Sequence, residues 1–560
     1  MVLENLVDTI GKAKLPKFIA NPKGSRQFQQ FIKLGSKEHR NAAIEALAKY
    51  VPELATRNIY ALLTIEKIVT YGLKTDEKFT TDKILKPAMT ERKIVEQLLY
   101  NKLGCKFLNK LYLHPCIKPA LKKQLLSIVL IPRTIELLGE SREKLRQYYL
   151  ETCKKCIDKE LLGLELVQRI FKQAVTDFSI ECDRHFNEEL LSMAADGLPH
   201  LLASRDGVVA VVKLLSLASA KQKKNFIKEL KGKFAEMAKN TVTCVVILRL
   251  LESVDDTVLL GKSVLSELVG AEYEKCKELL ADGTGRVPFL FALDGCQTAT
   301  GRYYYEPDKT LLANSPPLTT VKDAETRRSE IAAKLVPSIA KVVRSNLPEF
   351  VLSDSAKDVV LALLKNNLTE DKDELVKGAA TEIGLLSNHP QPAVSIATML
   401  LKEFPEVAGP ACLSAMLSQV GSDDSYTVGL VASKAAFVLL QLLKIEAVSE
   451  HVKGLLVRST KTISSITDEN KGTELIKAEL AKFQKTKYPS LAESQAAFPF
   501  SKQHRPVAEK PVAKKQKTAH ATETGVQSLF EEEEEGEESW GLLGDDDELA
   551  DLVGDDDEYI

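Results

Sequence analysis

Two similar helical units follow one another within residues 204–268, and this pair constrains the fold more than any other stretch. Apolar runs at 208–215 and 244–251 each predict a short helix followed by a polar turn. A longer amphipathic helix then closes each unit. The spacing from Gly207 to Thr243 is 36 residues, which is typical of helical solenoids. The pair therefore predicts an array of stacked helical repeats.

Small residues recur along the chain at comparable intervals, each at the predicted start of a repeat. A glycine or another short side chain lets one helix begin close to its neighbour. Successive positions are 37, 43, 59, 44, 36 and 42 residues apart, as expected of a diverged repeat. Almost no segment alternates in the manner of a β-strand, so we expect an all-α protein, an α-solenoid. The positions are Gly24, Ala61, Gly104, Gly163, Gly207, Thr243 and Gly285.

Changes in composition divide the chain into four predicted parts. A stretch rich in Gly, Pro and Thr at 295–322 predicts a loop, and Tyr71–Gly72 predicts a turn between two helices. Beyond Pro489 the sequence has too few apolar residues to form a core of its own, and we expect disorder. The parts are an N-terminal segment at 1–23, helical repeats at 24–322, further helical repeats at 323–490 and a basic then acidic tail at 491–560.

Charge is distributed unevenly along the chain. The segment from Glu523 to the C-terminus holds 17 acidic residues and no Lys or Arg, and since the whole chain carries −2, the residues before it carry about +15. A basic body indicates polyanionic partners, although lysine-rich helices also occur simply as solvated surfaces. One cluster stands out in the first of the two helical units. It comprises Lys221, Lys223, Lys224, Lys228, Lys231 and Lys233.

The remaining composition favours a protein without catalytic or metal chemistry. Cys153 and Cys156 form the only close cysteine pair, and no second pair completes a zinc site. We expect them to be semi-buried thiols on one helix face. No phosphate-binding loop, HExxH or GxSxG motif is present, so we expect no enzyme activity and no cofactor. We expect a soluble intracellular protein without membrane contact. The cysteines are scattered, no long apolar run is present, and the N-terminus lacks the apolar core of a signal peptide.

Polar triplets on two predicted repeat helices are candidates for reading nucleic-acid bases. Helical arrays that recognise RNA stack one side chain between bases while two others bond to a base edge. The first repeat offers Ser25, Arg26 and Gln29, which lie on one helix face. The third offers Cys105, Lys106 and Asn109, and the fourth a weaker set at Leu164, Glu165 and Gln168. Such residues also form ordinary polar helix surfaces, and that alternative stays open.

Several motifs resemble one family. GSRQFQ at 24–29, the KQKKNFIKELKG run at 221–232, VDDT at 254–257 and RRSEI at 327–331 are similar to the Puf-A branch of Pumilio-homology proteins. The resemblance implies an L-shaped array of Puf-like repeats, with 323–490 as the C-terminal CPL region. It also implies a nucleolar or nuclear protein that binds RNA or DNA with little sequence preference.

The resemblance further implies a role in assembly of the large ribosomal subunit, with pre-ribosomal RNA, pre-60S assembly proteins and double-stranded DNA as partners. The protein would be a monomer outside the particle. The places that correspond to base-reading triplets in other repeats hold mainly apolar residues, such as Val208 and Val212 or Cys244 and Leu248. Apolar pairs cannot bond to a base edge, so backbone electrostatics would supply most of the affinity.

A protein-binding scaffold of the armadillo or HEAT type is the rival interpretation. In that case the lysines would only face solvent, and the chain would not contact nucleic acid. Lysines gathered on one surface favour RNA binding, whereas lysines spread evenly favour the scaffold.

Overall fold

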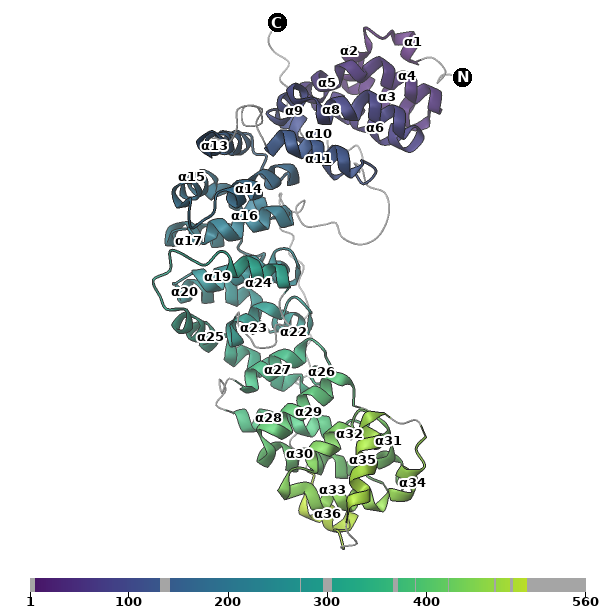
Figure 1. Cartoon of the computed structure of the whole chain (residues 1–560), viewed down its shortest axis with the longest axis vertical. Coiled ribbons are helices and arrows are strands. Elements are labelled where there is room, and N and C mark those ends of the chain that lie inside the picture. Colours follow the sequence, from purple (N-terminus) through teal and green to yellow (C-terminus); the bar gives the residue numbers. More distant parts are fainter. Residues whose placement is uncertain are drawn as a thin grey trace, which may run out of the picture. The chain divides into compact units, whose positions relative to one another are not determined.

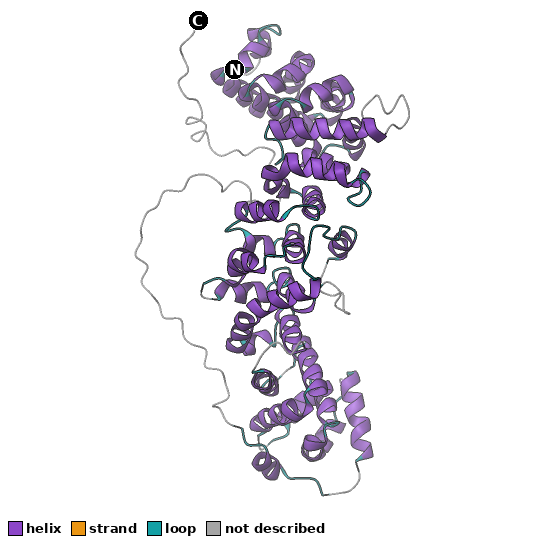
Figure 2. Cartoon of the chain, turned by 90° about the vertical axis from the view of Figure 1, so that its left-hand side faces the viewer, coloured by secondary structure: helices purple, strands orange, loops and turns teal. Residues whose placement is uncertain are grey.

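Every regular element among the described residues is a helix (Figures 1 and 2). The structure is a computed structural model and describes residues 6–130, 142–271, 273–295, 305–365, 371–387, 389–421, 423–467, 470–483 and 487–500. Contacts divide the chain into two units, with the boundary between Ala210 and Val211, inside helix α16 (Arg205–Leu215). The all-α prediction is confirmed. The L-shaped arrangement concerns how the parts sit together and stays a prediction.

The first unit is a row of inner helices backed by outer ones. Inner helices pack side by side in chain order (Figure 1). Their bounds are α3 (Pro22–Leu34), α6 (Ile59–Thr75), α10 (Lys102–Leu113) and α14 (Glu165–Asp177). The other elements are α1 (Leu6–Ile10), α2 (Leu15–Ile19), α4 (Lys37–Leu47), η1 (Ala48–Tyr50), α5 (Val51–Arg57), α7 (Glu77–Thr80), η2 (Thr81–Leu85), α8 (Lys86–Thr90), α9 (Arg92–Leu99), α11 (Pro119–Leu130), α13 (Arg142–Asp158), α15 (Arg184–Ala194) and η3 (Ala195–Ala203).

Asparagine caps tie inner helices α6 and α10 to the repeat before them. The amide oxygen of Asn58 accepts a hydrogen bond from the backbone N–H of Ala61 at 2.9 Å, which satisfies one of the free donors of α6. The amide nitrogen of the same side chain donates to the carbonyl of Ala20 at 2.9 Å, in the preceding repeat. Asn101 caps α10 in the same way. The repeat spacing in the sequence is therefore the spacing of a contact in the fold.

The small residues lie three positions after these caps, where the chain passes close to the previous helix. A Cβ atom on Gly24, Gly104 or Gly207 would lie 2.1, 2.6 or 1.8 Å from the carbonyl oxygen six residues earlier. Thr243 fills the same place differently, because its hydroxyl donates to that carbonyl, of Met237, at 3.1 Å. The predicted close approach is confirmed at these positions. Gly163 is an exception, since it precedes α14 and a Cβ there would meet nothing within 4 Å.

The second unit continues the same plan. Its inner helices α19 (Cys244–Ser253), α23 (Val287–Asp294), α27 (Ala356–Lys365), α29 (Gln391–Glu403), α32 (Ala436–Leu442) and α35 (Lys471–Lys482) pack successively. The other elements are α17 (Ala220–Glu229), α18 (Phe234–Lys239), α20 (Thr257–Leu260), η4 (Gly261–Leu265), α21 (Ser266–Val269), α22 (Glu274–Ala281), α24 (Glu306–Ala313), α25 (Ala324–Ser345), α26 (Leu347–Phe350), α28 (Lys372–Gly384), α30 (Pro405–Gln419), α31 (Ser425–Ala432), α33 (Glu446–Arg458), α34 (Thr460–Ser464) and α36 (Leu491–Ala497).

Three sequence-based expectations are corrected. The predicted turn at Tyr71–Gly72 is helical, because Gly72 allows close packing at this point of α6: a Cβ there would lie 2.5 Å from the hydroxyl of Thr80. The predicted loop at 295–322 contains α24 in its described part, whose first turn holds a proline. Order continues past Pro489, because Ser490 begins α36 with a capping box.

Residues 501–560, with the predicted tail and the KKQK cluster at 514–517, lie outside the described residues, as do 296–304. Within the described part, no single helix is long and apolar enough to cross a bilayer. Helices α31 and α32 reach that length and composition only as a pair, with a bend of 100° between them.

Candidate nucleic-acid interface

Counting from the caps identifies the open face of the inner helices in the first unit. The fifth, ninth and twelfth residues after a cap lie three or four positions apart and so share one helix face. In α3 this face holds exposed Arg26 and Lys33, and in α10 it holds exposed Lys106. Because the inner helices pack side by side, these positions form one continuous surface, which we call the basic ridge. Its residues are Arg26, Lys33, Lys67, Lys106, Lys110 and Arg169.

A buried carboxylate lies under the middle of the basic ridge. Glu66 is 6% exposed and accepts a bond from the Lys110 ammonium at 2.6 Å. Burial raises the pKa of Glu66, while Lys110, Lys106 and Lys67 act in the opposite direction. The charges of these three lysines therefore converge between α6 and α10. One of the three is partly neutralised by the carboxylate.

A carboxylate also partly neutralises the basic ridge at its α14 end. Arg169 lies 3.1 Å from a carboxylate oxygen of Asp206, and the Lys172 ammonium contacts the same carboxylate. Each of the three side chains is between one fifth and one third exposed. By contrast, among the residues that the structure describes, Lys33, Lys67 and Lys106 make no ion pair with a carboxylate. These three lysines offer the least compensated charge on the ridge.

The first predicted triplet is only partly on this surface. Ser25 is buried, and its hydroxyl donates to the carbonyl of Tyr60 at 3.0 Å. Gln29 donates from its amide to the Ser25 hydroxyl at 2.9 Å. Only Arg26 is exposed. In this arrangement Ser25 and Gln29 bond within the protein, so their role in RNA binding stays a prediction.

The second predicted triplet shows the same division. The Cys105 thiol is fully buried, and burial raises its pKa. The amide oxygen of Asn109 accepts a bond from the backbone of Leu166 at 2.8 Å, which joins α10 to α14. Lys106 alone is exposed. The fourth and eighth positions after the cap thus face the neighbouring helices, and the fifth faces outward.

When α14 is aligned with α3 by the first residue of each helix, the triplet predicted in the fourth repeat shifts along the sequence. Gln168 takes the place of Ser25 and is buried, with its amide donating to the carbonyls of Leu162 and His200 at 2.9 and 3.1 Å. Arg169 therefore takes the place of Arg26. Arg169 was not among the residues predicted from the sequence, and neither were the ridge residues Lys33, Lys67 and Lys110. The signal that identifies Lys67 and Lys110 is the asparagine three residues before each small anchor residue, from which the outward positions are counted.

The lysine cluster of the second unit lies on α17 and the turn after it. Lys221, Lys224 and Lys228 are exposed and lie three and four residues apart, so they share one face of the helix. Lys231 is exposed and Lys233 is half-buried in the following turn. Lys223 differs from the rest because it is only 3% exposed. Its ammonium donates to the carbonyl of Ser253 at 2.7 Å.

Burial has a clear electrostatic consequence for Lys223. Loss of solvation lowers its pKa to about 8, with Arg327 and Arg249 acting in the same direction and Asp255 against it. An ammonium held in this way inside the fold is a structural group. A phosphate contact by Lys223 stays a prediction, whereas the exposed lysines on α17 are accessible to a ligand.

The close cysteine pair noted in the sequence lies on α13. Cys153 and Cys156 are three residues apart on α13, but both are fully buried and not semi-buried as expected, and burial raises the pKa of each. No group of three or more His, Cys, Asp or Glu in the described ranges is placed to hold a metal ion.

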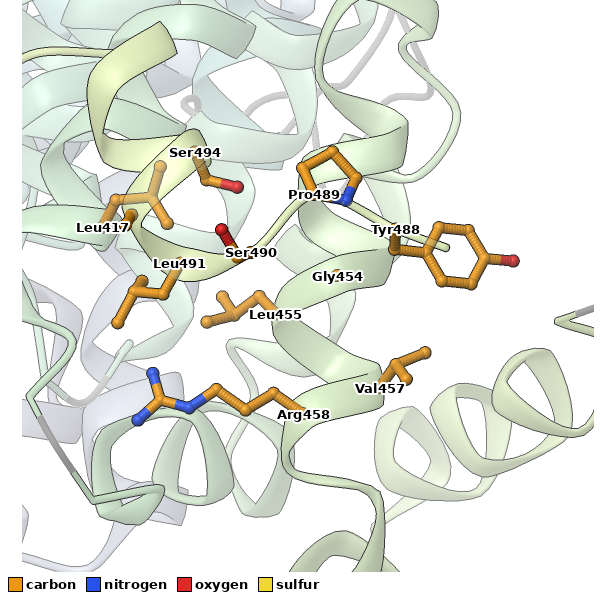
Figure 3. Close-up of a pocket in the computed structure, with 11 residues that line it drawn as sticks. Leu417, Gly454, Leu455, Val457, Arg458, Tyr488, Pro489, Ser490, Leu491 and Ser494 are labelled. Atoms are coloured by element: carbon orange, nitrogen blue, oxygen red, sulfur yellow. The ribbon is translucent and has the colours of Figure 1, made fainter. Parts of the chain in front are cut away.

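A cavity of about 500 Å³ lies between α33 and the segment before α36 (Figure 3). Leu455, Leu491 and Arg458 are among its lining residues. Its described lining contains no carboxylate, histidine or cysteine.

Comparisons with known proteins agree with this architecture. The model of the CPL (NUC119) domain matches residues 281–407. The chain is 28% identical over 228 residues to Pumilio homology domain family member 6 of Schizosaccharomyces pombe, covering 40% of this chain and 34% of that protein. This alignment thus spans only about a third of the relative's length. The predicted domain boundary at 322 falls within the CPL match, and the one at 490 lies beyond it. Both boundaries stay predictions.

Two crystal structures show the same fold over most of the chain. Human Puf-A superposes with a TM-score of 0.69 at 19% identity, covering 86% of this chain and 94% of that one. Human Puf-A in complex with DNA gives a TM-score of 0.65 at 18% identity, covering 85% of this chain and 94% of that one. The chain is an α-solenoid of Puf-like helical repeats. Its resemblance to the Puf-A type of Pumilio-homology proteins is confirmed.

Proposed function

We propose that this chain binds RNA through its phosphate backbone, with little sequence preference, and accepts DNA on the same surface. The observation that carries the proposal is the basic ridge, where six outward positions hold Arg or Lys. The positions suited to base reading are buried at Ser25, Cys105, Asn109 and Gln168. Lysine and arginine contacts to phosphates release counterions and carry no sequence information. The bond of Asn109 to the backbone of Leu166 illustrates how a base-reading position is used for packing instead.

Binding to unrelated nucleic acids tests this proposal directly. Titrations with two structured RNAs of different sequence, a single-stranded RNA and a DNA duplex are expected to give affinities within about tenfold of one another at one salt concentration. A protein that reads bases discriminates by about 1–3 kcal/mol for each good base pair contact. Preference for one sequence by more than a hundredfold would contradict backbone recognition.

We further propose that the RNA is pre-ribosomal and that the chain is an assembly factor for the large ribosomal subunit. The resemblance to Puf-A proteins supports this assignment, and the exposed lysines on α17 provide a second basic surface for a large RNA. Depletion of the protein is expected to accumulate precursors of the large-subunit RNA and to leave small-subunit precursors unchanged. Normal amounts of both precursor classes after depletion would rule the assignment out.

Such a role requires the protein to reach the nucleolus. We propose that the basic cluster at 514–517 promotes nuclear import, because clusters of lysine are typical of import signals. Deletion of residues 505–520 is expected to shift the protein toward the cytoplasm in fluorescence images. Unchanged nucleolar accumulation would leave entry with a partner as the better explanation.

A further inference from the structure

The outward face of the inner helices is closed in part of the second unit. Counted from the cap at Asn240, Val245 and Arg249 of α19 correspond to the ridge positions, yet both are 0% exposed. Ser216, at the end of α16, is also 0% exposed. In the first unit Arg26 takes the position of Val245 and Lys33 takes that of Ser216, and both are exposed to solvent.

The segment that closes this face is residues 305–322, which we call the strap. It contains α24, which lies beside α19 (Figure 1). Arg249 of α19 donates from its guanidinium to the carbonyl of Leu312 at 3.1 Å, where α24 ends. Tyr305 and Asp308 of the strap line a small cavity of about 90 Å³ together with Cys244 of α19.

The extended part of the strap is held mainly through its backbone. Ser216 bonds to it twice: its hydroxyl donates to the carbonyl of Ser315 at 2.8 Å, and its own carbonyl accepts from the N–H of Leu318 at 2.9 Å. The Thr319 hydroxyl donates to the carbonyl of Ala218 at 2.8 Å. These contacts bind a polypeptide as such, since most of them use atoms that every residue has.

The motifs noted in the sequence meet where the strap ends. Lys223, from the lysine-rich run, donates to the hydroxyl of Thr319 at 2.9 Å. Asp255, from VDDT, accepts from the N–H of Val321 at 2.7 Å and pairs with Arg327, from RRSEI, also at 2.7 Å. Arg327 in turn donates to the carbonyl of Lys322 at 3.0 Å. Three distant motifs thus join to fix one segment.

We propose that the outward face of α19 and the end of α16 is a polypeptide-binding surface, filled by the strap of the same chain and thereby closed to nucleic acid. Two apolar residues indicate that this surface stays covered. Val245 and Val287 take the fifth position after the cap, which Arg26, Lys106 and Arg169 occupy in the first unit. An exposed apolar stripe would cost solvation free energy, whereas a covered one contributes to the core. The exclusion of nucleic acid rests on the proposed function, but the binding of the strap does not.

The thiol of Cys244 reports on the strap without any nucleic acid. Cys244 is 4% exposed beneath the strap, whereas Cys182 is exposed. Alkylation of the intact chain, followed by peptide mass spectrometry, is expected to modify Cys244 far more slowly than Cys182. Thr319→Val removes the hydroxyl bonds and is expected to speed modification of Cys244 about tenfold, since local opening becomes easier. Thr398→Val, which loses a bond within α29, is the matched control and is expected to leave the rate unchanged.

A peptide test examines the surface itself. In one variant, residues 306–321 are replaced by a Gly/Ser segment of equal length, and a fluorescent peptide with the sequence of 305–322 is added. The variant is expected to bind this peptide saturably and a scrambled peptide at least tenfold more weakly, while the intact protein binds neither. Equal binding of both peptides, or alkylation of Cys244 as fast as that of Cys182, would overturn the proposal. If the replacement prevents folding, the alkylation rates of the intact chain and Thr319→Val still decide the matter.

Photo-crosslinking to RNA separates the two parts of the inference. Crosslinks are expected on peptides of the basic ridge and of α17, and none on the α19 peptide 244–253. Crosslinks on 244–253 in the intact protein would overturn the exclusion of nucleic acid. Complete absence of RNA binding would contradict the proposed function and leave the alkylation result standing.

Discussion

The two bonds of Asn58 allow a direct test of how the repeats are joined. Its amide oxygen caps α6, and its amide nitrogen reaches the preceding repeat at the carbonyl of Ala20. Loss of a cap costs about 1 kcal/mol, and loss of one further hydrogen bond about the same. Asn58→Ala removes both and is expected to cost about 2 kcal/mol. Asn58→Ser keeps the cap and loses the bond between repeats, at a cost of about 1 kcal/mol.

Hydrogen exchange of the full chain measures both losses locally. These free energies correspond to about fivefold faster exchange of α6 amides for Asn58→Ser and about thirtyfold for Asn58→Ala. Asn240→Ser serves as the control, because the exposed Asn240 side chain makes only cap bonds among the described residues, to Val242 and Thr243. Wild-type protection of α6 in Asn58→Ser, combined with rapid exchange in Asn58→Ala, would refute a contribution from the contact between repeats.

Four further changes have expected outcomes. Gly207→Ala forces a Cβ against a carbonyl and is expected to cost about 1–3 kcal/mol in urea unfolding, whereas Gly163→Ala, in open space, is expected to be neutral. Burial lowers the pKa of His389 to about 4, so the stability present above pH 6.5 is lost as the pH falls toward 4. His389→Gln is expected to flatten that part of a Tm–pH profile. Glu66→Gln removes a negative charge beneath the basic ridge and is expected to tighten RNA binding in a low-salt titration. Truncation after Gln527 removes the acidic tail and is expected to tighten RNA binding at low salt, an effect that disappears as salt screens the charge.

The repeat architecture could be predicted from spacing because the same contact recurs along the chain. Gly24, Gly104 and Gly207 are small for one physical reason, the carbonyl of the preceding helix, and this reason is visible as a period in the sequence. Gly163 and Gly72 fail as markers of a repeat start and of a turn, because a glycine also occurs in open loops and within packed helices. Spacing alone does not separate these cases.

The site could be predicted less completely, because residue type does not reveal which way a side chain faces. Ser25 and Asn109 have the chemistry to bond to a base but bond within the protein. Lys223 belongs to an exposed-looking lysine run but is buried, since its neighbour Ser253 lies 30 residues further along the chain. Of the two predicted triplets, only Arg26 and Lys106 are exposed, and their role in RNA binding stays a prediction. The strap was invisible to sequence reasoning because its partners are up to about a hundred residues away.

The salt dependence of RNA binding shows whether the basic ridge is the nucleic-acid interface. In one variant Lys33, Lys67 and Lys106 of the basic ridge become Ala, and a matched variant changes the exposed lysines Lys93, Lys123 and Lys154 of the outer helices. Each lost phosphate contact reduces the slope of log K against log salt by about 0.7–0.9. The ridge variant is expected to give a slope flatter by about 2 and weaker binding of every RNA, and the control variant is expected to bind like the wild type. Equal slopes for the two variants would contradict the assignment of the basic ridge as the nucleic-acid interface.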